Sequence, residues 1–237
     1  MSYSVKDILR MEVAPALGCT EPVAIALGAA AAATLLPGNP IERIEIWVDP
    51  NIYKNGLAVS IPGTDGLTGL DTAAAIGALG GDATLKLEVL KPITEEVVAK
   101  AKELLNAGGT KVNLLTDHKG LYIKTVLHSG SDRAESVIRD LHDNIVTLKL
   151  NDQEQTAGDL ISTEPGSGTK SDLLQLESWL KELSLSDLLE MVDNLDQEDK
   201  TFLQEGIDFN MQLAEHGLKH GQGLGVGKTL ERPARQG

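Results

Sequence analysis

Cysteine is almost absent from this sequence, which has one among 237 residues. A single cysteine cannot form an internal disulfide, so a secreted scaffold held together by disulfides is excluded. Aromatic residues make up only 3% of the chain, and the core must therefore be built from Ala, Val, Ile and Leu. Hydrophobic residues still account for 41%, a share that is ordinary for a globular protein.

Basic residues are also scarce, because 21 Lys and Arg stand against 35 Asp and Glu and give a formal net charge of −14. A nucleic-acid binder needs a basic face to neutralise phosphates, and an anionic membrane surface attracts the same kind of face. The excess acid is concentrated late in the chain: residues 1–150 carry a net charge of −4 and residues 151–237 a net charge of −10. We therefore expect no nucleic acid and no membrane among the partners.

The sequence has no apolar run long enough to span a membrane. Its longest, from Val23 to Leu36, is 14 residues with interruptions at Gly28 and Thr34, and fits a buried helix better. The first residues lack the basic region and apolar run of a signal peptide. These two absences predict a cytoplasmic protein.

The apolar periodicity predicts an α+β (mixed α/β) fold that begins with helices. Ser4 and Asp7 have the spacing of a capping box ahead of a helix that stops before Pro15. A second helix begins near Thr20, with Thr20 or Glu21 as its cap, and its apolar residues on every side indicate burial.

A sheet with helices on it is expected next. The helices are predicted over 72–79, with Asp71 as a possible cap, and over 93–106. The strands are predicted near 41–48, 57–61, 84–90, 111–115, 121–128, 134–139 and 145–150. The close run of short strands at the end favours a mixed, partly antiparallel sheet.

Beyond the sheet the sequence predicts a C-terminal all-helical segment. Helices are expected at about 171–183, 186–194 and 197–216, with Gly217 ending the last. We therefore divide the chain into a mixed α/β domain over 1–150, a linker or loop over 151–170, a helical segment over 171–230 and a frayed tail over 231–237.

The one cysteine, Cys19, lies just ahead of the second predicted helix. Free N–H groups and the helix dipole at such a position favour negative charge, which would lower the pKa of the thiol. Thr20 and Glu21 place a hydroxyl and a carboxylate beside the sulfur. A reactive or metal-binding thiol and a buried structural cysteine both fit this position.

A second polar segment joins the strands predicted at 41–48 and 57–61. Its Asn51, Lys54 and Asn55 could bind a carboxylate or another anion through side-chain amides, the ammonium group and backbone N–H groups. The same residue types are also what a simple turn requires.

Two other motifs carry less weight. Gly223 to Thr229 looks like a phosphate-binding loop, but the first glycine that such a loop needs is replaced by Gln222. His216 and His220 have the spacing of two metal ligands, but Gly217 is predicted to end the helix between them. A flexible turn and a solvated helix end are the favoured interpretations.

Several of these segments together resemble one known family, the L-cysteine desulfidases and their serine dehydratase-like relatives. The signature-like stretch is Glu12–Pro22, which contains Gly-Cys-Thr-Glu-Pro at its end. Supporting segments are 50–51, 54–56, 61–63, 77–81 and 87–90, and the resemblance runs from about residue 9 to about residue 230.

The resemblance implies an oxygen-sensitive lyase with a 4Fe–4S cluster, which releases pyruvate, ammonia and sulfide from L-cysteine by α,β-elimination. It makes Cys19 one ligand of the cluster, and Thr20 and Glu21 catalytic-site residues. Asn51, Lys54 and Asn55 become candidates for binding the small amino-acid substrate. An L-serine dehydratase component is the alternative of the same kind.

The chain departs from the family in length and in cysteine content. Members of the family are nearly twice as long and carry their other cluster cysteines in a C-terminal helical domain. One thiolate cannot hold such a cluster, so we expect it to be absent from this chain alone, and the chain to be inactive alone. The chain would then be a truncated product, a separate subunit or a degenerate relative, with the missing domain or a second copy as partner.

A non-catalytic module that binds a small amino acid, or only pairs with another chain, is the alternative from a different class. A third hypothesis, a thiol enzyme with Cys19 as nucleophile, needs a nearby base, and no histidine is near Cys19 in sequence.

Overall fold

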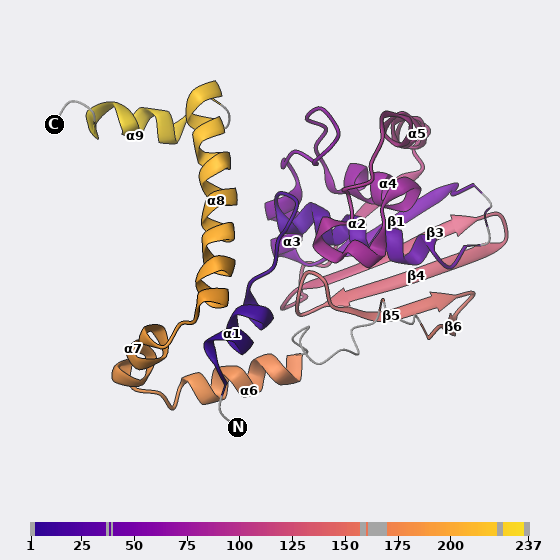
Figure 1. Cartoon of the computed structure of the whole chain (residues 1–237). Coiled ribbons are helices and arrows are strands. Elements are labelled where there is room, and N and C mark those ends of the chain that lie inside the picture. Colours follow the sequence, from indigo (N-terminus) through magenta and orange to yellow (C-terminus); the bar gives the residue numbers. More distant parts are fainter. Residues whose placement is uncertain are drawn as a thin grey trace. The chain divides into compact units, whose positions relative to one another are not determined.

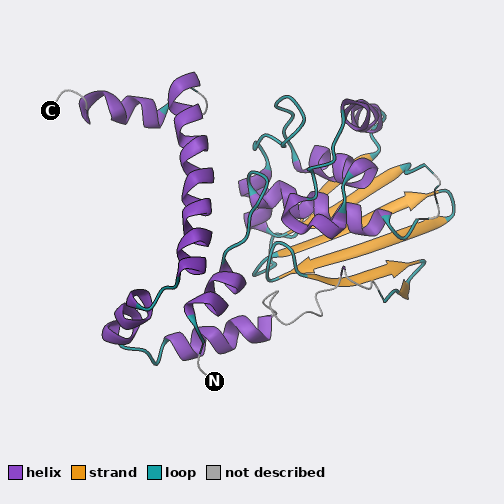
Figure 2. Ribbon diagram, in the orientation of Figure 1, coloured by secondary structure: helices purple, strands orange, loops and turns teal. Residues whose placement is uncertain are grey.

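A computed structural model describes residues 3–36, 38, 40–156, 160, 170–221 and 225–234. It confirms the mixed α/β class, with a six-stranded sheet and a helical C-terminal part (Figure 2). Residues 14–174 form one compact unit, called here the α/β unit. Residues 1–13 and 175–237 form another, called the helical unit, so the first helix groups with the last ones and not with the sheet.

The α/β unit contains all the strands of the described residues (Figure 1). Its helices are α2 (Thr20–Ala33), α3 (Pro50–Gly56), α4 (Leu70–Gly80), the 3-10 helix η1 (Ala83–Glu88) and α5 (Glu95–Asn106). Its strands are β1 (Arg43–Val48), β2 (Thr110–Leu114), β3 (Tyr122–Ser129), β4 (Asp132–Arg139), β5 (Ile145–Leu150) and β6 (Gln153–Glu154).

The sheet has the order β2-β1-β3-β4-β5-β6 and is mixed, as predicted. Strands β1 and β2 are parallel, with Ile46 opposite Val112, and α3, α4 and α5 lie in the connection between them. All the other pairs are antiparallel, and Ile46 faces Thr125 of β3. The end of β1, the start of β3, the end of β4 and the start of β5 therefore lie at the same end of the sheet.

The core lies between one face of the sheet and two buried helices. Helix α2 packs across β3, β4 and β5, while α4 packs on α2 and on β1 and β2. Both helices consist mainly of Ala, Gly, Leu and Ile, and α2 is buried from Pro22 to Ala32. Small residues allow a close approach: a Cβ at Gly77 of α4 would overlap the backbone of Ala26 in α2.

The opposite face of the sheet is covered with paired charges. Glu135 on β4 forms ion pairs with Lys124 at 3.0 Å and with Arg133 at 2.7 Å. His128 and Glu45 pair across β3 and β1 at 3.0 Å. Since side chains alternate along a strand, Ile46 and Ile138 face the helices, whereas these charged residues share the other face with Val126 and Val137.

The helical unit is built from α1 (Val5–Glu12), α7 (Leu185–Asp193), α8 (Gln197–His220), α9 (Val226–Ala234) and the C-terminal part of α6 (Lys170–Leu180). Capping boxes start α1, α7 and α8, through Ser4 with Asp7, Ser184 with Asp187, and Asp196 with Asp199. The first of these is the one predicted from sequence. Across the parts of the chain that the structure describes, no helix has the length and apolar character needed to cross a membrane.

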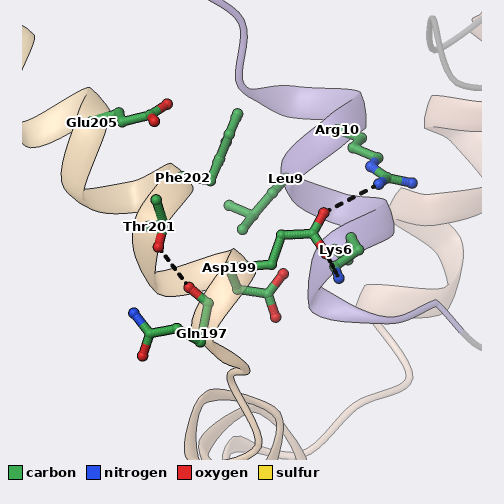
Figure 3. Close-up of a pocket in the computed structure, with 9 residues that line it drawn as sticks. Lys6, Leu9, Arg10, Gln197, Asp199, Thr201, Phe202 and Glu205 are labelled. Carbon is green, nitrogen blue, oxygen red and sulfur yellow. Dashed lines mark hydrogen bonds and ion pairs between the residues drawn. The ribbon is translucent and has the colours of Figure 1, made fainter.

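Helix α1 contacts the beginning of α8. Lys6 forms ion pairs with Asp196 at 3.1 Å and Glu198 at 2.7 Å. Leu9 and Phe202 lie on the two sides of a pocket of about 450 Å³ between the helices (Figure 3). The pocket is open to solvent, and charged side chains surround the small apolar area formed by Leu9 and Phe202.

Two predicted strands are wrong. Residues 57–61 contribute only an isolated bridge between Ser60 and Thr68, because the preceding segment is helix α3 and not a turn. Residues 83–88 form η1 instead of a strand, started by Asp82, whose side chain accepts the N–H of Thr84. Asp49 starts the helix that precedes the first of these runs and Asp82 starts η1 in the second, and periodicity alone does not assign so short an apolar run.

Several predicted helix ends also differ from the structure. Cys19, not Thr20 or Glu21, occupies the N-cap of α2, and Gly69, not Asp71, precedes α4. Helix α8 continues through Gly217 and ends at Gly221, whose φ of +67° suits glycine. Residues 231–234 belong to α9, whereas 235–237 and most of the predicted linker over 151–170 lie outside the described residues.

Candidate functional site

Cys19 is half-buried at the entrance of helix α2, as the sequence predicts. The turn before it depends on Gly18, which has a φ of +84°. A side chain at Gly18 would also press on Pro62, since an added Cβ would lie 3.0 Å from Cγ of that proline. The loop over 61–66 thus packs against the cysteine turn, and Gly18 allows that approach.

The Glu21 carboxylate accepts the hydrogen bonds formed around Cys19. The Cys19 thiol donates a hydrogen bond to Oε2 of Glu21 at 2.8 Å, and Nδ2 of Asn55 donates to Oε1 at 3.1 Å. The Thr20 hydroxyl is 3.5 Å from Oε2, at the limit of a hydrogen bond. We call Cys19, Glu21 and Asn55 the Cys19 cluster.

The Cys19 thiol is not activated in the way the sequence suggests. Burial raises the pKa of the Cys19 thiol, and the hydrogen bond to the Glu21 carboxylate raises it further. The backbone N–H groups of Glu21 and Thr20 act in the predicted direction, but their effect is smaller. The Cys19 thiol is held by a carboxylate, and the lowered pKa expected at the entrance of the helix is wrong for this chain.

The Glu21 carboxyl is charged at neutral pH. Burial opposes its ionisation, but hydrogen bonds from Cys19, its own backbone N–H and Asn55 outweigh that effect and lower the pKa of Glu21. The imidazole of His142 acts electrostatically in the same direction. His142, in the loop between β4 and β5, thus lies within electrostatic reach of Glu21, and its distance along the chain left no signal in the sequence.

Helix α3 brings the predicted substrate-binding residues to this place. Asp49 caps it: one carboxylate oxygen accepts the N–H groups of Asn51 and Ile52 at 2.8 and 3.2 Å, and the other accepts that of Tyr122 at 2.9 Å. Asp49 is buried, so this carboxylate joins the end of β1 and the start of α3 to β3. The segment predicted as a turn is a positioned helix.

Asn51, Lys54 and Asn55 share one face of α3, because residues three and four apart are neighbours on a helix. The Asn55 side chain reaches Glu21, so α3 and the start of α2 meet at this contact. The Asn51 and Lys54 side chains are exposed and make no polar contact within the described part of the chain. They are free to meet a ligand beside Glu21.

A strained residue lies next to the Cys19 cluster. Lys86 has φ +50° and ψ −119°, a conformation that costs free energy for any residue with a side chain. The following carbonyl, that of Leu87, accepts the N–H of Leu17 at 3.2 Å. The strained segment is therefore hydrogen-bonded to the turn that presents Cys19, and no sequence pattern indicates this strain.

Metal-binding groups are incomplete. Within 3–36, 40–156 and the other described residues, no three His, Cys, Asp or Glu side chains are arranged to hold a metal ion. His216 and His220 lie on one face of α8, with ring centroids 4.4 Å apart, since the helix continues through Gly217.

The sequence is similar to curated proteins that carry the name UPF0597. It is 56% identical over 236 residues to the one from Desulfotalea psychrophila and 54% identical over 237 residues to the one from Desulfatibacillum aliphaticivorans. Each match covers 100% of this chain and 54% of the relative. A protein of Clostridium tetani is 39% identical over 95% of this chain and 51% of its own length.

The chain therefore spans about half the length of the curated relatives it matches. No family model matches the chain, and no solved structure does.

Proposed function

We propose that this chain is one portion of an iron–sulfur amino-acid lyase that removes sulfide and ammonia from L-cysteine, and that it is inactive alone. The observation that carries the proposal is the Cys19 cluster, in which a half-buried thiol is held by a charged carboxylate. The span of about half of each relative supports the second part, since the rest of the site then lies on other polypeptide.

The residues present do not fit a whole 4Fe–4S cluster. The chain has one cysteine, and no other metal-binding group is complete within its described residues. Cys19 fits one ligand position, because it is partly exposed at the entrance of α2. The proposal assigns the other ligands to the polypeptide that the relatives have in addition.

Glu21 fits a positioning role better than that of a base. Its lowered pKa leaves it charged, and a carboxylate of that kind is a weak acceptor of protons at neutral pH. It can orient the Cys19 thiol and meet the ammonium group of an amino acid. Lys54 and the amide of Asn51, exposed on the same face of α3, suit the carboxylate of that amino acid.

The test is anaerobic reconstitution with iron and sulfide. The chain is compared alone and co-expressed with the part of the Desulfotalea psychrophila relative that it does not span. We expect a cluster absorption band, and sulfide release from L-cysteine, only with the added polypeptide. If Cys19→Ala left the activity of the completed protein intact, the assignment of Cys19 would be wrong. L-serine as substrate distinguishes the serine dehydratase alternative.

A small-amino-acid-binding module without turnover is the second candidate. The exposed Lys54 and Asn51 beside the charged Glu21 favour it for the chain on its own. Calorimetry with L-cysteine and L-serine on the isolated chain would show binding that Lys54→Ala weakens, with no product. The raised pKa of Cys19 counts against a thiol enzyme, since the nucleophile would be protonated.

A further inference from the structure

The helical unit has almost no core of its own. Of its apolar side chains, Leu176 is the one that is buried among the residues described. Eleven large apolar side chains of α7, α8 and α9 are instead more than a third exposed: Leu185, Leu188, Leu189, Val192, Phe202, Ile207, Phe209, Met211, Leu213, Val226 and Leu230. A surface of this kind indicates an interaction site.

The exposed residues follow helical periodicity. In α7 they are Leu185, Leu188, Leu189 and Val192, which lie on one face. In α8, Phe202, Phe209 and Leu213 form one stripe, and Leu203, Ile207, Met211 and Leu218 form a second beside it. Beyond its first turn, most polar residues of α8 occupy the remaining side, with Asn210 and His220 as exceptions, so its largely apolar arc covers roughly 200° of the helix circumference.

An apolar arc this wide is typical of a helix with neighbours on two sides. Helix α1 covers only the first turns of α8, where Leu9 and Phe202 line the pocket of Figure 3. Among its described residues the α/β unit offers no matching face: its exposed large apolar residues lie singly on separate segments, and they are Leu57, Leu85, Leu114, Val146 and Leu174. The described part of the chain therefore supplies no matching cover for α7–α9.

We propose that the apolar faces of α7, α8 and α9 are the docking surface for the part of the relatives that this chain does not span. The match to the Desulfotalea psychrophila protein includes all of this chain, helical unit included, and leaves nearly half of the relative outside. The docking segment would present aliphatic helix faces between α7 and α8 and beside α9.

A second copy of the chain is a poorer occupant. Residues 175–237 carry 12 acidic and 6 basic side chains, and the polar side of α8 includes Glu205, Asp208 and Glu215. Self-pairing would bring these acidic borders together, and like charges in contact disfavour association. The docking segment is therefore expected to border its apolar faces with Lys and Arg.

The test is co-expression of the tagged chain with the part of the Desulfotalea psychrophila relative that it does not span. Phe209→Asp, in the apolar arc, is compared with Gln212→Asp, on the polar side of the same helix. We expect a one-to-one complex in which amide exchange of α7–α9 slows. Phe209→Asp should weaken binding at least about tenfold, while Gln212→Asp leaves it within about twofold.

The proposal is overturned if Phe209→Asp binds like the unsubstituted chain, or if the added segment protects no amide of α8. It is also overturned if the chain dimerises through this surface and the segment does not compete. Should the separate segment fail to fold, a single-chain fusion replaces it, and equal Tm values for the two variants contradict the proposal. None of these measurements needs iron or turnover, so failure of the proposed lyase function is distinguishable.

Discussion

Helices α2 and α8 differ in how completely their apolar residues are covered. Helix α2 is apolar all round and buried from Pro22 to Ala32, between α4 and the sheet. Helix α8 has an apolar arc that is exposed over most of its length, including Phe209, which is 61% exposed, and Leu213, which is 73% exposed. Helix α2 belongs to a complete hydrophobic core, whereas the apolar residues of α8 are only partly covered.

The comparison teaches that two kinds of stability operate in one chain. The α/β unit obtains its free energy of folding from burial of apolar area within itself. The helical unit relies on local devices, such as the capping boxes of α1, α7 and α8, until something covers it. We expect the two units to unfold separately, and four predictions test that difference.

The largest effect is expected from matched glycine substitutions. Gly77→Ala places a methyl group against the backbone of Ala26 and should destabilise the α/β unit by about 3 kcal/mol. Gly206→Ala, in α8, meets nothing within 4 Å and should stabilise its helix by about 0.5–1 kcal/mol. Urea unfolding followed by circular dichroism measures both. Equal effects would contradict the division into a covered and an uncovered unit.

Asp49→Asn should cause the next largest loss of stability. Asparagine keeps one oxygen for the cap of α3 but turns an N–H donor toward the N–H of Tyr122, which then has no acceptor. The expected loss is about 1–3 kcal/mol, confined to the α/β unit. Hydrogen exchange resolves the location, and loss of protection in α8 to the same extent would show that the units are coupled.

Glu21→Gln should change the reactivity of Cys19. Without the carboxylate the pKa of the thiol falls, so the rate of alkylation by iodoacetamide at pH 8 should rise several-fold. Thr20→Ala is the control and should leave the rate nearly unchanged. Urea that unfolds only the helical unit should not alter the rate in either variant. An alkylation rate that changes as α8 unfolds would show that the two units are not independent.

Acid should destabilise the helical unit by a small amount. Hydrogen bonds from Ser4 and Ser184 lower the pKa of Asp7 and Asp187, and the N–H of Asp199 and Lys6 lower that of Asp196. A lowered folded-state pKa stabilises at pH values above the unfolded value and is lost as the pH falls through the folded value. Helical signal should therefore decrease below about pH 4. Ser184→Ala should remove part of this dependence.

Much of the fold could be predicted, because long periodic segments carry strong signals. The buried helix over 20–33, the capping box at Ser4 and the strands from 110 to 150 were of this kind. Short apolar runs were not, since the runs over 57–61 and 84–90 fit a strand and a helix equally by periodicity. Helix ends were missed by one or two residues where Cys19 and Gly69 precede the expected caps.

The candidate site divides in the same way. Cys19 and Glu21 could be found because they are adjacent in sequence, and Asn55 because it lies in a polar segment at the end of a strand. His142 and the strain at Lys86 depend on contacts between distant segments and have no local signature. The sign of the Cys19 pKa shift depends on how deeply the thiol is buried and on where the Glu21 carboxylate points. The local sequence determines neither of these.

The position of Asp49 affects how mutational scans of this chain would be interpreted. Its carboxylate fixes α3, α3 carries Asn55, and Asn55 holds Glu21 beside Cys19. A screen that reads only growth or turnover would rank Asp49 with the residues that touch a ligand, although it is buried and touches none of the Cys19 cluster. A parallel readout of cellular abundance would separate the two classes, since substitutions at Asp49 reduce the amount of protein and substitutions at Glu21 leave it in place.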